Sequence, residues 1–352
     1  MPLIRRSEQL LLSPIHITPS HDDLEVIGVF NPGAATLSGA VVLLVRVAER
    51  PRERRAGFTP SPRWSADHGV TVDWLKNDLL DTTDPRVVKI LPSGPTRLTF
   101  VSHLRLVRLG DDSSVGEVTE TRIVPESRWE EYGVEDPRIT FLDGRYDITY
   151  AAASRHGVAT ALASTLDFTR FERHGIIFCP DNKDVVLFPE RISGHYTAIH
   201  RPSSAAGFCR PEMWIARSPD LIHWGRHERL YGGQSDWEAD RVGAGPPPVR
   251  TPEGWLLIYH ASSRPASGER VGVYAVGAML LDPENPARVI RRTTEPILVP
   301  TSAHEQGGFV AGVVFPTGLV ERGRSLVLYS GAADEHVVAI ELDRDEVLAA
   351  ME

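Results

Sequence analysis

Short runs of hydrophobic and β-branched residues, separated by turns that contain glycine, are the main pattern of this chain. A proline, a turn glycine five to seven residues later and a run of strand-forming residues recur together five times. Short runs of this kind between turn signals predict β-strands. The five copies begin at Asn31-Pro32, Asp136-Pro137, Phe188-Pro189, Pro247-Pro248 and Phe315-Pro316, and their turn glycines are Gly39, Gly144, Gly194, Gly254 and Gly323.

This internal repeat predicts the architecture. A repeat every few tens of residues is typical of a protein built from similar units, and each unit here reads as strand, turn, strand. Five sheets arranged around an axis form a five-bladed β-propeller, in which neighbouring sheets bury one another's faces. We therefore expect an all-β chain in which residues 1–352 form one five-bladed propeller domain, with a short N-terminal extension and a C-terminal helix over residues 344–351.

The first repeat interval contains an insertion. The interval from Pro32 to Pro137 is about twice as long as the later ones, whereas a propeller blade needs ~40–50 residues. The extra residues fall at about 48–98, and within them we expect two helical turns over residues 72–80. Long insertions often serve function, so we expect this one to overhang the substrate opening or to mediate contact between subunits.

Composition and charge exclude several classes of protein. A net charge of −9 argues against a nucleic-acid-binding protein, whose surface would be basic. The two cysteines, Cys179 and Cys209, match no zinc or redox spacing. No apolar stretch reaches the ~18 residues of a membrane span, and the N-terminus lacks the apolar region of a signal peptide. We therefore expect a cytoplasmic protein with neither a membrane nor a nucleic acid as partner.

The repeat also predicts where functional side chains converge. If the turns lie at one rim, the start of each first strand and the end of each second strand lie together at the opposite rim. A concave mouth lined by convergent polar groups is then the expected site. The polar residues at strand starts are Asn31, Asp136, Lys183 and Arg241, and those at strand ends are Arg46, Arg201, His260 and Asp334.

The residue types in this predicted mouth favour carboxylate chemistry beside an anion site. The chain contains no metal-ligand spacing, no Gly-x-Ser-x-Gly elbow and no phosphate-loop signature, so we expect neither a metal nor an organic cofactor. Trp129 and Tyr132 lie shortly before Asp136, and Trp237 lies four residues before Arg241. Aromatic faces pack against the C–H faces of sugars, so these three aromatic residues are candidates for sugar binding.

Several motifs carry a family resemblance. They are residues 133–140 (GVEDPRIT), 183–190 (KDVVLFPE), 243–248 (GAGPPP) with 254–260 (GWLLIYH), and 331–334 (GAAD). Together they closely resemble the motifs of glycoside hydrolase family 130, over a stretch from about Asn31 to the C-terminus that leaves most of the insertion unmatched. The resemblance implies a five-bladed β-propeller, in agreement with the repeat. It also implies an enzyme acting on β-mannosides, either an inverting phosphorylase or an inverting β-1,2-mannosidase.

By this resemblance Asp136 is the proton donor, and in family phosphorylases the proton reaches the bridging oxygen through a substrate hydroxyl. An aspartic acid with the usual pKa of ~3.9 is ionised at neutral pH. Asp136 therefore needs a raised pKa, from burial or from a nearby carboxylate, to donate a proton. We expect Glu135 to face the other side of its strand and to form a salt bridge to a neighbouring blade.

The resemblance also implies binding residues. Lys183, Arg201 and Arg241 match the three basic positions that hold phosphate in family phosphorylases. His260 matches a position that holds sugar or phosphate, depending on whether its imidazole is neutral or charged. The residues assigned to substrate binding are Asn31, Arg46 and Asp334, which match family positions for the transferred mannose, together with Arg138, Trp129, Tyr132 and Trp237.

The retained cations favour a phosphorylase over a hydrolase. Phosphate must be held by Arg and Lys on a chain with this net charge, whereas an inverting hydrolase needs a carboxylate base ~6.5–9.5 Å from its acid. If the chain were a hydrolase, the candidate bases would be Glu190, Glu212 and Glu238. We therefore predict an inverting phosphorylase that cleaves β-mannosides, in particular β-1,2-linked ones, with inorganic phosphate as co-substrate to give mannose 1-phosphate.

Two readings from other classes stay open. A non-catalytic sugar-binding propeller would need no buried acid, and an Asp136→Asn variant would separate it from an enzyme. A five-bladed glycosidase with three carboxylates would have no use for an anion pocket. The expected partners are a β-mannoside oligosaccharide, inorganic phosphate and further copies of the chain in a homo-oligomer.

Overall fold

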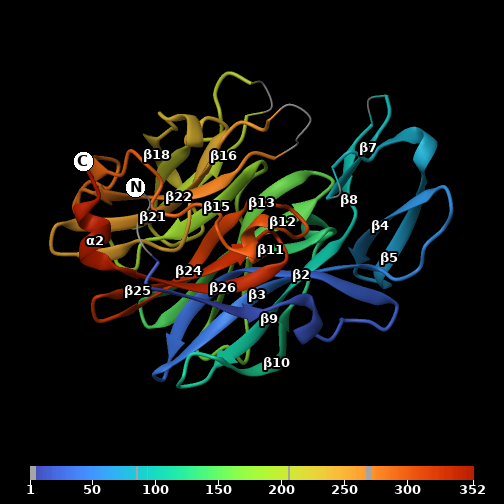
Figure 1. Ribbon diagram of the computed structural model, residues 1–352, viewed down its shortest axis with the longest axis horizontal. Helices are drawn as coiled ribbons and strands as arrows, with labels where there is room; N and C mark the ends of the chain where they lie inside the picture. Colours follow the sequence, from blue (N-terminus) through green and yellow to red (C-terminus); the bar gives the residue numbers. More distant parts are fainter. Residues whose placement is uncertain (1–4, 85, 93, 205–206, 267–270) are drawn as a thin grey trace.

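The protein is built almost entirely of β-strands, which confirms the all-β prediction (Figure 1). The computed structural model describes residues 5–84, 86–92, 94–204, 207–266 and 271–352. Within these residues, strands that are close in the sequence pair antiparallel and form five units in chain order, with a separate insertion in the first.

The first two units share one eight-stranded sheet. Its two halves are joined where Gly133 pairs in parallel with Ser102. The strands of the first unit are β2 (Leu24–Leu37), β3 (Ala40–Pro51), β9 (Val101–Leu109) and β10 (Val115–Ile123), and those of the second are β11 (Gly133–Leu142), β12 (Arg145–Ser154), β13 (Gly157–Thr165) and β14 (Glu172–Phe178).

The other three units are separate sheets. The third contains β15 (Asn182–Leu187), β16 (Tyr196–Pro202), β17 (Met213–Ser218) and β18 (Gly225–Tyr231). The fourth contains β19 (Arg241–Ala244), β20 (Val249–Thr251), β21 (Gly254–Ser262), β22 (Tyr274–Leu281) and β23 (Val289–Arg292). The fifth contains β24 (Val314–Arg322), β25 (Ser325–Ala332), β26 (His336–Asp343) and β1 (Ser7–Leu12).

All five predicted turn glycines lie at the turn that joins the first two strands of a unit's hairpin. The residue pairs Ser38-Gly39 and Asp143-Gly144 have φ angles of 50° and 87° and of 50° and 83°. Type I′ hairpin turns need two consecutive residues with positive φ, which explains the glycine at these two turns and at the equivalent Ser193-Gly194 turn. The turns join β2 to β3, β11 to β12, β15 to β16, β20 to β21 and β24 to β25.

The hydrophobic core lies between adjacent units. Side chains alternate between the two faces of a strand, and β3 shows the consequence. Val41, Leu43 and Val45 pack in a cluster shared with the fifth unit, whereas Val42 and Leu44 pack in a cluster shared with the second unit. Both faces of β3 are therefore buried, which explains why its sequence is a continuous hydrophobic run.

The same relation holds for every unit. Five core clusters each join two neighbouring units, and the pairs they join are first and second, second and third, third and fourth, fourth and fifth, and fifth and first. Strand contacts follow the same cyclic order, because β12 contacts β15, β16 contacts β19, β22 contacts β24 and β24 contacts β2.

The insertion forms two small sheets of its own. One is a hairpin of β4 (Phe58–Ser65) and β5 (Gly69–Lys76), and the other contains β6 (Leu80–Asp81), β7 (Val87–Ile90) and β8 (Thr96–Leu98). The prediction of helical turns over residues 72–80 is largely wrong. Consecutive β-branched residues at Val70, Thr71 and Val72 favour the strand, and only the 3₁₀ turn η2 (Asn77–Leu79) follows it.

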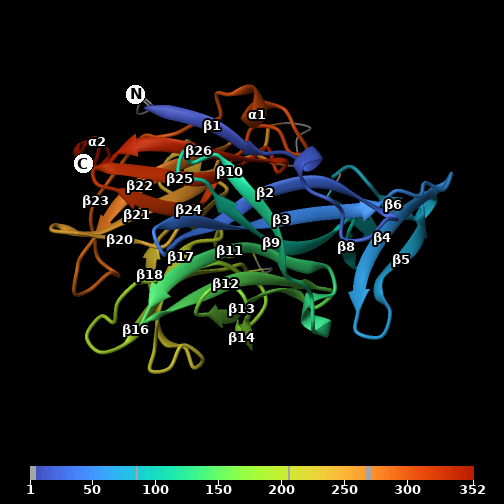
Figure 2. The ribbon, with the colours of Figure 1, turned by 90° about the horizontal axis from the view of Figure 1, so that it is seen from below.

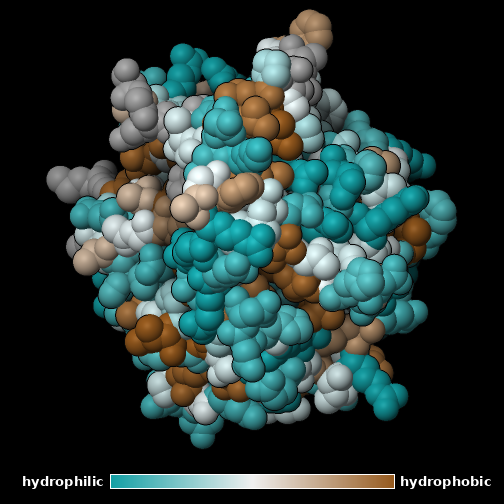
Figure 3. Space-filling model, turned by 90° about the vertical axis from the view of Figure 1, so that its right-hand side faces the viewer, coloured by the Kyte–Doolittle hydropathy of each residue, from teal (hydrophilic) through white to brown (hydrophobic). Residues whose placement is uncertain are grey.

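The insertion stands at one side of the molecule and the two termini lie at the other (Figures 1 and 2). The surface seen from the side of the insertion is mostly hydrophilic, with hydrophobic residues in separate small patches (Figure 3). The predicted N-terminal extension contributes β1, which pairs with β26. The predicted C-terminal helix is α2 (Arg344–Ala349), whose first turn is capped by the side chain of Asp343.

The remaining helical elements are single turns. They are α1 (Ala303–Gln306), η1 (Pro14–His16), η3 (Arg128–Glu130) and η4 (Asp236–Glu238). Among the described residues, no helix has the length and apolar character needed to pass through a bilayer.

Candidate active site

A cavity of about 270 Å³ lies where the starts of the first strands meet the ends of the second strands. All five units and the insertion contribute to it. Its lining residues are Phe30, Asn31, Arg46, Arg86, Val87, Leu98, Phe100, Glu135, Asp136, Lys183, Asp184, Arg201, Arg241, Val271, Tyr274, Phe309, Val310, Val313, Phe315 and Asp334.

Seven residues predicted from the sequence line this cavity. Five of them lie near the start of a first strand or the end of a second strand, whereas Asn31 and Arg46 lie in the middle of the long strands β2 and β3. Each unit supplies at least one of the seven. Asn31 and Arg46 come from the first unit, Asp136 from the second, Lys183 and Arg201 from the third, Arg241 from the fourth, and Asp334 from the turn after β25 in the fifth.

A repeated backbone irregularity directs three polar side chains at these strand starts. Asn31, Asp136 and Asp184 have φ angles of 47°, 50° and 55°, in the left-handed region. Each lies in a β-bulge, where the pairing of its strand with the next shifts by one residue. A bulge re-aims side chains that a regular strand would alternate between its faces, and Asn and Asp tolerate positive φ better than most residues.

The carboxylate of Asp136 is buried and held by two donors. The Asn31 Nδ2 atom donates to its Oδ1 at 2.8 Å, and an Arg46 terminal nitrogen donates to the same oxygen at 2.9 Å. Burial favours the neutral acid, but the positive charges of Arg46, Arg138 and Lys183 outweigh burial and lower the pKa of Asp136. The predicted raised pKa of Asp136 is therefore not found, because cations surround this carboxylate.

Glu135 lines the cavity rather than facing away from it. Its Oε1 accepts a hydrogen bond of 2.6 Å from Arg46, which belongs to the neighbouring unit. The predicted salt bridge between units is thus present, but the bulge turns the side chain to the cavity side of the strand. Arg46 therefore binds the carboxylates of both Glu135 and Asp136.

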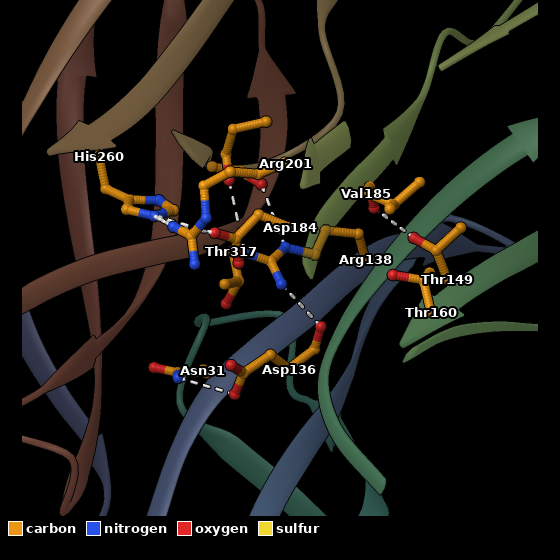
Figure 4. Close-up of polar contacts among 12 residues, drawn as sticks. Asn31, Asp136, Arg138, Thr149, Thr160, Asp184, Val185, Arg201, His260 and Thr317 are labelled. Atoms are coloured by element: carbon orange, nitrogen blue, oxygen red, sulfur yellow. Dashed lines mark hydrogen bonds and ion pairs between the residues drawn. The ribbon is translucent and has the colours of Figure 1, made fainter. Parts of the chain in front are cut away.

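A buried charge cluster centred on Asp184 lies next to the Asp136 site (Figure 4). The carboxylate of Asp184 accepts from Arg138 at 3.0 Å and forms an ion pair of 2.5 Å with Arg201. The Nε2 atom of His260 lies 3.2 Å from the same carboxylate. Burial favours the neutral acid, but the charges of Arg201, His260 and Arg138 hold the pKa of Asp184 well below its usual range. Asp184 is therefore ionised.

The three predicted phosphate-binding cations line one cavity. Arg201 is anchored by Asp184, and Arg241 is anchored by Asp240, whose Oδ2 accepts from its Nε at 2.6 Å. Lys183 has no carboxylate within salt-bridge distance among the residues described here. Its ammonium is thus the cation of this group with the least internal compensation, which suits it to an anionic ligand.

Asp334 has electrostatic properties opposite to those of Asp136. Burial raises its pKa to about 6, and the nearby Asp136 and Glu135 charges act in the same direction, although Arg46 and Arg86 oppose them. Its carboxylate is thus ionised at neutral pH and changes charge in mildly acidic solution, whereas Asp136 remains ionised.

Five of the predicted binding residues do not line the cavity. Arg138 and His260 are buried beneath it and bind Asp184. Burial lowers the pKa of His260 although Asp184 favours its charged form, and its Nε2 atom lies 3.2 Å from the Asp184 carboxylate, so the ring supports the charge cluster from beneath rather than lining the cavity. Trp129 packs on His156, Tyr132 is buried in the turn before β11, and Trp237 stacks on Tyr259 and donates to the backbone carbonyl of Thr294.

The three candidate bases of a hydrolase lie outside the cavity. Glu238 is buried and accepts hydrogen bonds from Tyr231 and Tyr259. Glu212 forms a salt bridge with Arg229. Glu190 is exposed, beside the turn that joins β15 to β16. Among the described residues, the carboxylates that line the cavity are instead those of Glu135, Asp136, Asp184 and Asp334.

Besides Asp184, sequence reasoning missed two groups of cavity residues. The first is Arg86 with Val87 and Leu98, from the insertion, which carries no repeat pattern that could have placed them. The second is an apolar wall formed by Phe30, Phe100, Phe309, Tyr274 and Phe315. Phe315 directly precedes the proline of the fifth repeat, and Phe30 lies two residues before the proline of the first, so aromatic residues next to the repeat prolines were a signal for the wall.

Comparison with known proteins shows that this chain is similar to mannoside phosphorylases. A family model described as beta-1,4-mannooligosaccharide phosphorylase matches residues 101–352. A beta-1,2-mannobiose phosphorylase of Listeria innocua is 36% identical over 358 residues, which cover 100% of this chain and 99% of that protein. A 1,2-beta-oligomannan phosphorylase of Thermoanaerobacter sp. is 38% identical over 213 residues, which cover 59% of this chain and 68% of that protein.

A solved structure extends this similarity to three dimensions. The beta-1,2-mannobiose phosphorylase from Listeria innocua in complex with beta-1,2-mannobiose has a TM-score of 0.91 to this protein at 35% identity. The match covers 97% of this chain and 96% of that one.

Proposed function

The chain belongs to glycoside hydrolase family 130, and we propose that it cleaves β-1,2-linked mannosides with inorganic phosphate, with inversion, to release mannose 1-phosphate. It is an enzyme of the β-mannoside phosphorylase class, in line with the names of its full-length relative and of the matching family model. The β-1,2 linkage follows the relatives from Listeria innocua and Thermoanaerobacter sp..

One observation carries this proposal. A carboxylate, Asp136, and three cations, Lys183, Arg201 and Arg241, come from three different units and line the same cavity. A phosphorylase needs an acid on the leaving-group side and an anion site on the opposite side of the transferred sugar. Most other glycosidases need a second carboxylate in place of the anion site.

These residues suggest the following reaction. A phosphate oxygen, held by Lys183, Arg201 and Arg241, attacks the anomeric carbon while the bond to the bridging oxygen breaks. The bridging oxygen takes up a proton that Asp136 supplies, in the manner of family phosphorylases through a substrate hydroxyl. Attack on a β-mannoside from the opposite face gives the α-configured mannose 1-phosphate, and the shortened sugar leaves with the proton.

Phosphate itself helps to explain how Asp136 acquires a proton. Three cations lower the pKa of this carboxylate in the unliganded protein, and Lys183 is one of them. A bound phosphate adds one to two negative charges beside Lys183. Nearby negative charge favours the neutral form of a carboxylic acid, so phosphate binding raises the pKa of Asp136 and prepares it for proton donation.

A direct assay tests the proposal. The purified protein is incubated with β-1,2-mannobiose, with and without phosphate, and mannose and mannose 1-phosphate are measured; β-1,4-mannobiose serves as the comparison substrate. We expect mannose 1-phosphate and mannose in equal amounts, only with phosphate present, and faster with the β-1,2 substrate. Equal release of mannose without phosphate would instead identify a β-1,2-mannosidase, and binding without any cleavage would identify a sugar-binding protein.

We also propose that the five units are the blades of a five-bladed β-propeller and that residues 1–352 form a single domain. The cyclic order of the five core clusters supports this arrangement, because each unit shares its core with both neighbours. A single domain should unfold in one cooperative transition, and two separate calorimetric transitions would count against it. The cytoplasmic location and a homo-oligomeric state stay predictions from the sequence.

A further inference from the structure

A carboxylate that lines an anion-binding cavity needs a reason to be there, because its charge repels phosphate. Asp184 is such a carboxylate, and its side chain is 3% exposed. Its Oδ1 accepts a hydrogen bond from Arg138 at 3.0 Å, and its buried Oδ2 makes no hydrogen bond but lies within ion-pair distance of two protein groups, 2.5 Å from Arg201 and 3.2 Å from His260. Asp184 therefore acts on its neighbours rather than on a ligand.

We propose that Asp184 is the positioning residue of the phosphate site. It orients Arg201 toward the bound anion, and it fixes Arg138, which in turn holds the backbone of Asp136 in place. The proposal rests on the phosphorylase function proposed above and identifies what organises its phosphate-binding residues. The reacting atoms would contact Arg201 and Asp136 but not Asp184.

The contacts of Arg201 support the first part. One terminal nitrogen of its guanidinium lies 2.5 Å from Asp184 and 3.4 Å from Nε2 of His260. The guanidinium is planar and rigid, so fixing one nitrogen fixes the direction of the others. Buried Asp184 and His260 thus set the orientation of Arg201, while its side chain still lines the cavity.

The contacts of Arg138 support the second part. One terminal nitrogen donates to Asp184 at 3.0 Å, and the other donates to the backbone carbonyl of Asp136 at 2.9 Å (Figure 4). Asp136 has a left-handed backbone in a bulge, a conformation that surrounding contacts must maintain. Arg138 therefore links the anion side of the cavity to the predicted proton donor.

Gly243 shows how closely this cluster is packed. A Cβ atom at this position would lie 2.5 Å from Asp184 Oδ2, 2.6 Å from His260 Nε2 and 2.8 Å from an Arg201 nitrogen. A methyl group there would displace the cluster without changing any charge. Gly243 thus offers a way to disturb the geometry of the cluster while its electrostatics stay intact.

The experiment compares two variants that disturb the cluster by different means. Asp184→Asn removes the charge and keeps the size, whereas Gly243→Ala keeps every charge and moves the groups. The controls are Asp147→Asn, a buried aspartate outside the cavity, and Gly225→Ala, where an added Cβ meets no atom within 4 Å. The readouts are kcat, the KM values for phosphate and for β-1,2-mannobiose, and the rise in Tm caused by phosphate.

We expect both cluster variants to raise the KM for phosphate about tenfold or more, since displacement by about 1 Å is costly at a reacting site. The KM for mannobiose should change by less than about threefold, and phosphate should no longer raise the Tm, because weaker binding gives less stabilisation. The Tm readout needs no catalytic activity, so it applies to a variant that is folded but inactive. In kcat, in both KM values and in the size of the phosphate-induced rise in Tm, both controls should match the unaltered protein.

Three outcomes would overturn the inference. The first is an unchanged KM for phosphate in both variants, and the second is an equal rise in the KM values for phosphate and for mannobiose. The third is a lowered KM for phosphate in Asp184→Asn, which would mean that the charge of Asp184, rather than the geometry it imposes, governs phosphate binding. If Asp184→Asn does not fold, Gly243→Ala decides alone. A failure of the proposed function can be distinguished from these outcomes. In that case the unaltered protein would cleave mannobiose without phosphate, and phosphate would not raise its Tm.

Discussion

Asn31 and Asp136, which are 105 positions apart in the chain, are joined by a hydrogen bond of 2.8 Å from Nδ2 to Oδ1. Both residues occupy the same bulge position in neighbouring units. Arg46 donates to the same oxygen, and no hydrogen bond from the described residues reaches Oδ2. In the proposed reaction the second oxygen of Asp136 would therefore be the one that carries the proton.

Replacing this acid should abolish most of the activity. Asp136→Asn keeps the shape but cannot deliver a proton, and general acid catalysis contributes roughly 10²–10⁴-fold. We expect kcat for phosphorolysis of β-1,2-mannobiose to fall by that factor, with the Tm within a few degrees of the unaltered protein. A variant that retains more than a tenth of the activity would show that another group donates the proton.

Removing the partner of Asp136 should shift the pH profile. The hydrogen bond from Asn31 helps to lower the pKa of this carboxylate, so Asn31→Ala raises that pKa. The acid then stays protonated to higher pH, and the basic limb of the kcat profile should move to higher pH. The profile is measured at saturating mannobiose and phosphate, so that weaker sugar binding does not contribute. A limb that stays in place, or moves to lower pH, would contradict the assignment of Asp136 as the acid.

Lys183 should be needed for phosphate more than for sugar. A hydrogen bond to a charged group contributes about 1.5–3 kcal/mol, so Lys183→Gln should raise the KM for phosphate by about tenfold to hundredfold. The KM for mannobiose should change little. Lys76→Gln, an exposed lysine of the insertion, is the matched control. If both substitutions have the same small effect, Lys183 is not part of the phosphate site.

Asp334 should make the protein less stable as pH rises through mildly acidic values. Its pKa is about 6 in the folded state and about 3.9 in the unfolded chain. Between these values the folded state keeps a proton that the unfolded chain has lost, so stability falls as pH rises from about 4 to about 6 and is not regained above. Asp334→Asn should therefore have a higher Tm than the unaltered protein at pH 7.5 and lose that advantage near pH 4.

A second aspartate separates stability from function in this test. Burial also raises the pKa of Asp147 to about 6, outside the cavity. Asp147→Asn should thus show the same pH-dependent gain in Tm without any change in the KM for mannobiose, whereas Asp334→Asn should raise that KM about tenfold because a hydroxyl acceptor is lost. Equal kinetics in the two variants would remove Asp334 from the sugar site.

The insertion should contribute to catalysis through Arg86. This side chain lines the cavity and is held by two hydrogen bonds to Asp84. Arg86→Gln should lower kcat/KM for mannobiose about tenfold through loss of a charged donor. Arg63→Gln, in the β4–β5 hairpin of the same insertion and about equally exposed, should have no effect. If neither substitution changes kcat/KM for mannobiose, the insertion does not contribute to catalysis through Arg86.

The repeat was sufficient to predict the turns and seven of the cavity residues, but not every strand end, since β2 and β3 continue past Asn31 and Arg46. Its glycines mark turns that need positive φ, and the polarity of each strand end is visible in the sequence. Arg46 and Arg201, for example, both end hydrophobic runs, and both line the cavity. Short-range patterns of this kind can be interpreted from the sequence alone, because the geometry of a hairpin depends on only a few neighbouring residues.

Burial and register could not be read in the same way. The bulge of the third unit reads Lys183-Asp184-Val185 without a proline, so the repeat was aligned on Phe188-Pro189 and Asp184 was missed. Whether Arg138 reaches the cavity or lies under it depends on groups far away in the sequence. The tryptophans were chosen for their proximity along the chain, whereas the apolar wall is assembled from residues that only the packing of units brings together.

The pairing of β1 with β26 has a consequence for how the enzyme is made. β1 leaves the ribosome before the other strands of its sheet, and it can find its partner β26 only after the first four units have been synthesised. Until then the edge of β26's sheet is unfinished and the opening segment is unattached. Nascent chains that stall before β26 is complete, and chains cleaved near β1, should therefore lack this strand pairing. In the second case β26 exposes unpaired backbone N–H and C=O groups that chaperones or proteases can bind, whereas in the folded protein β1 covers this edge.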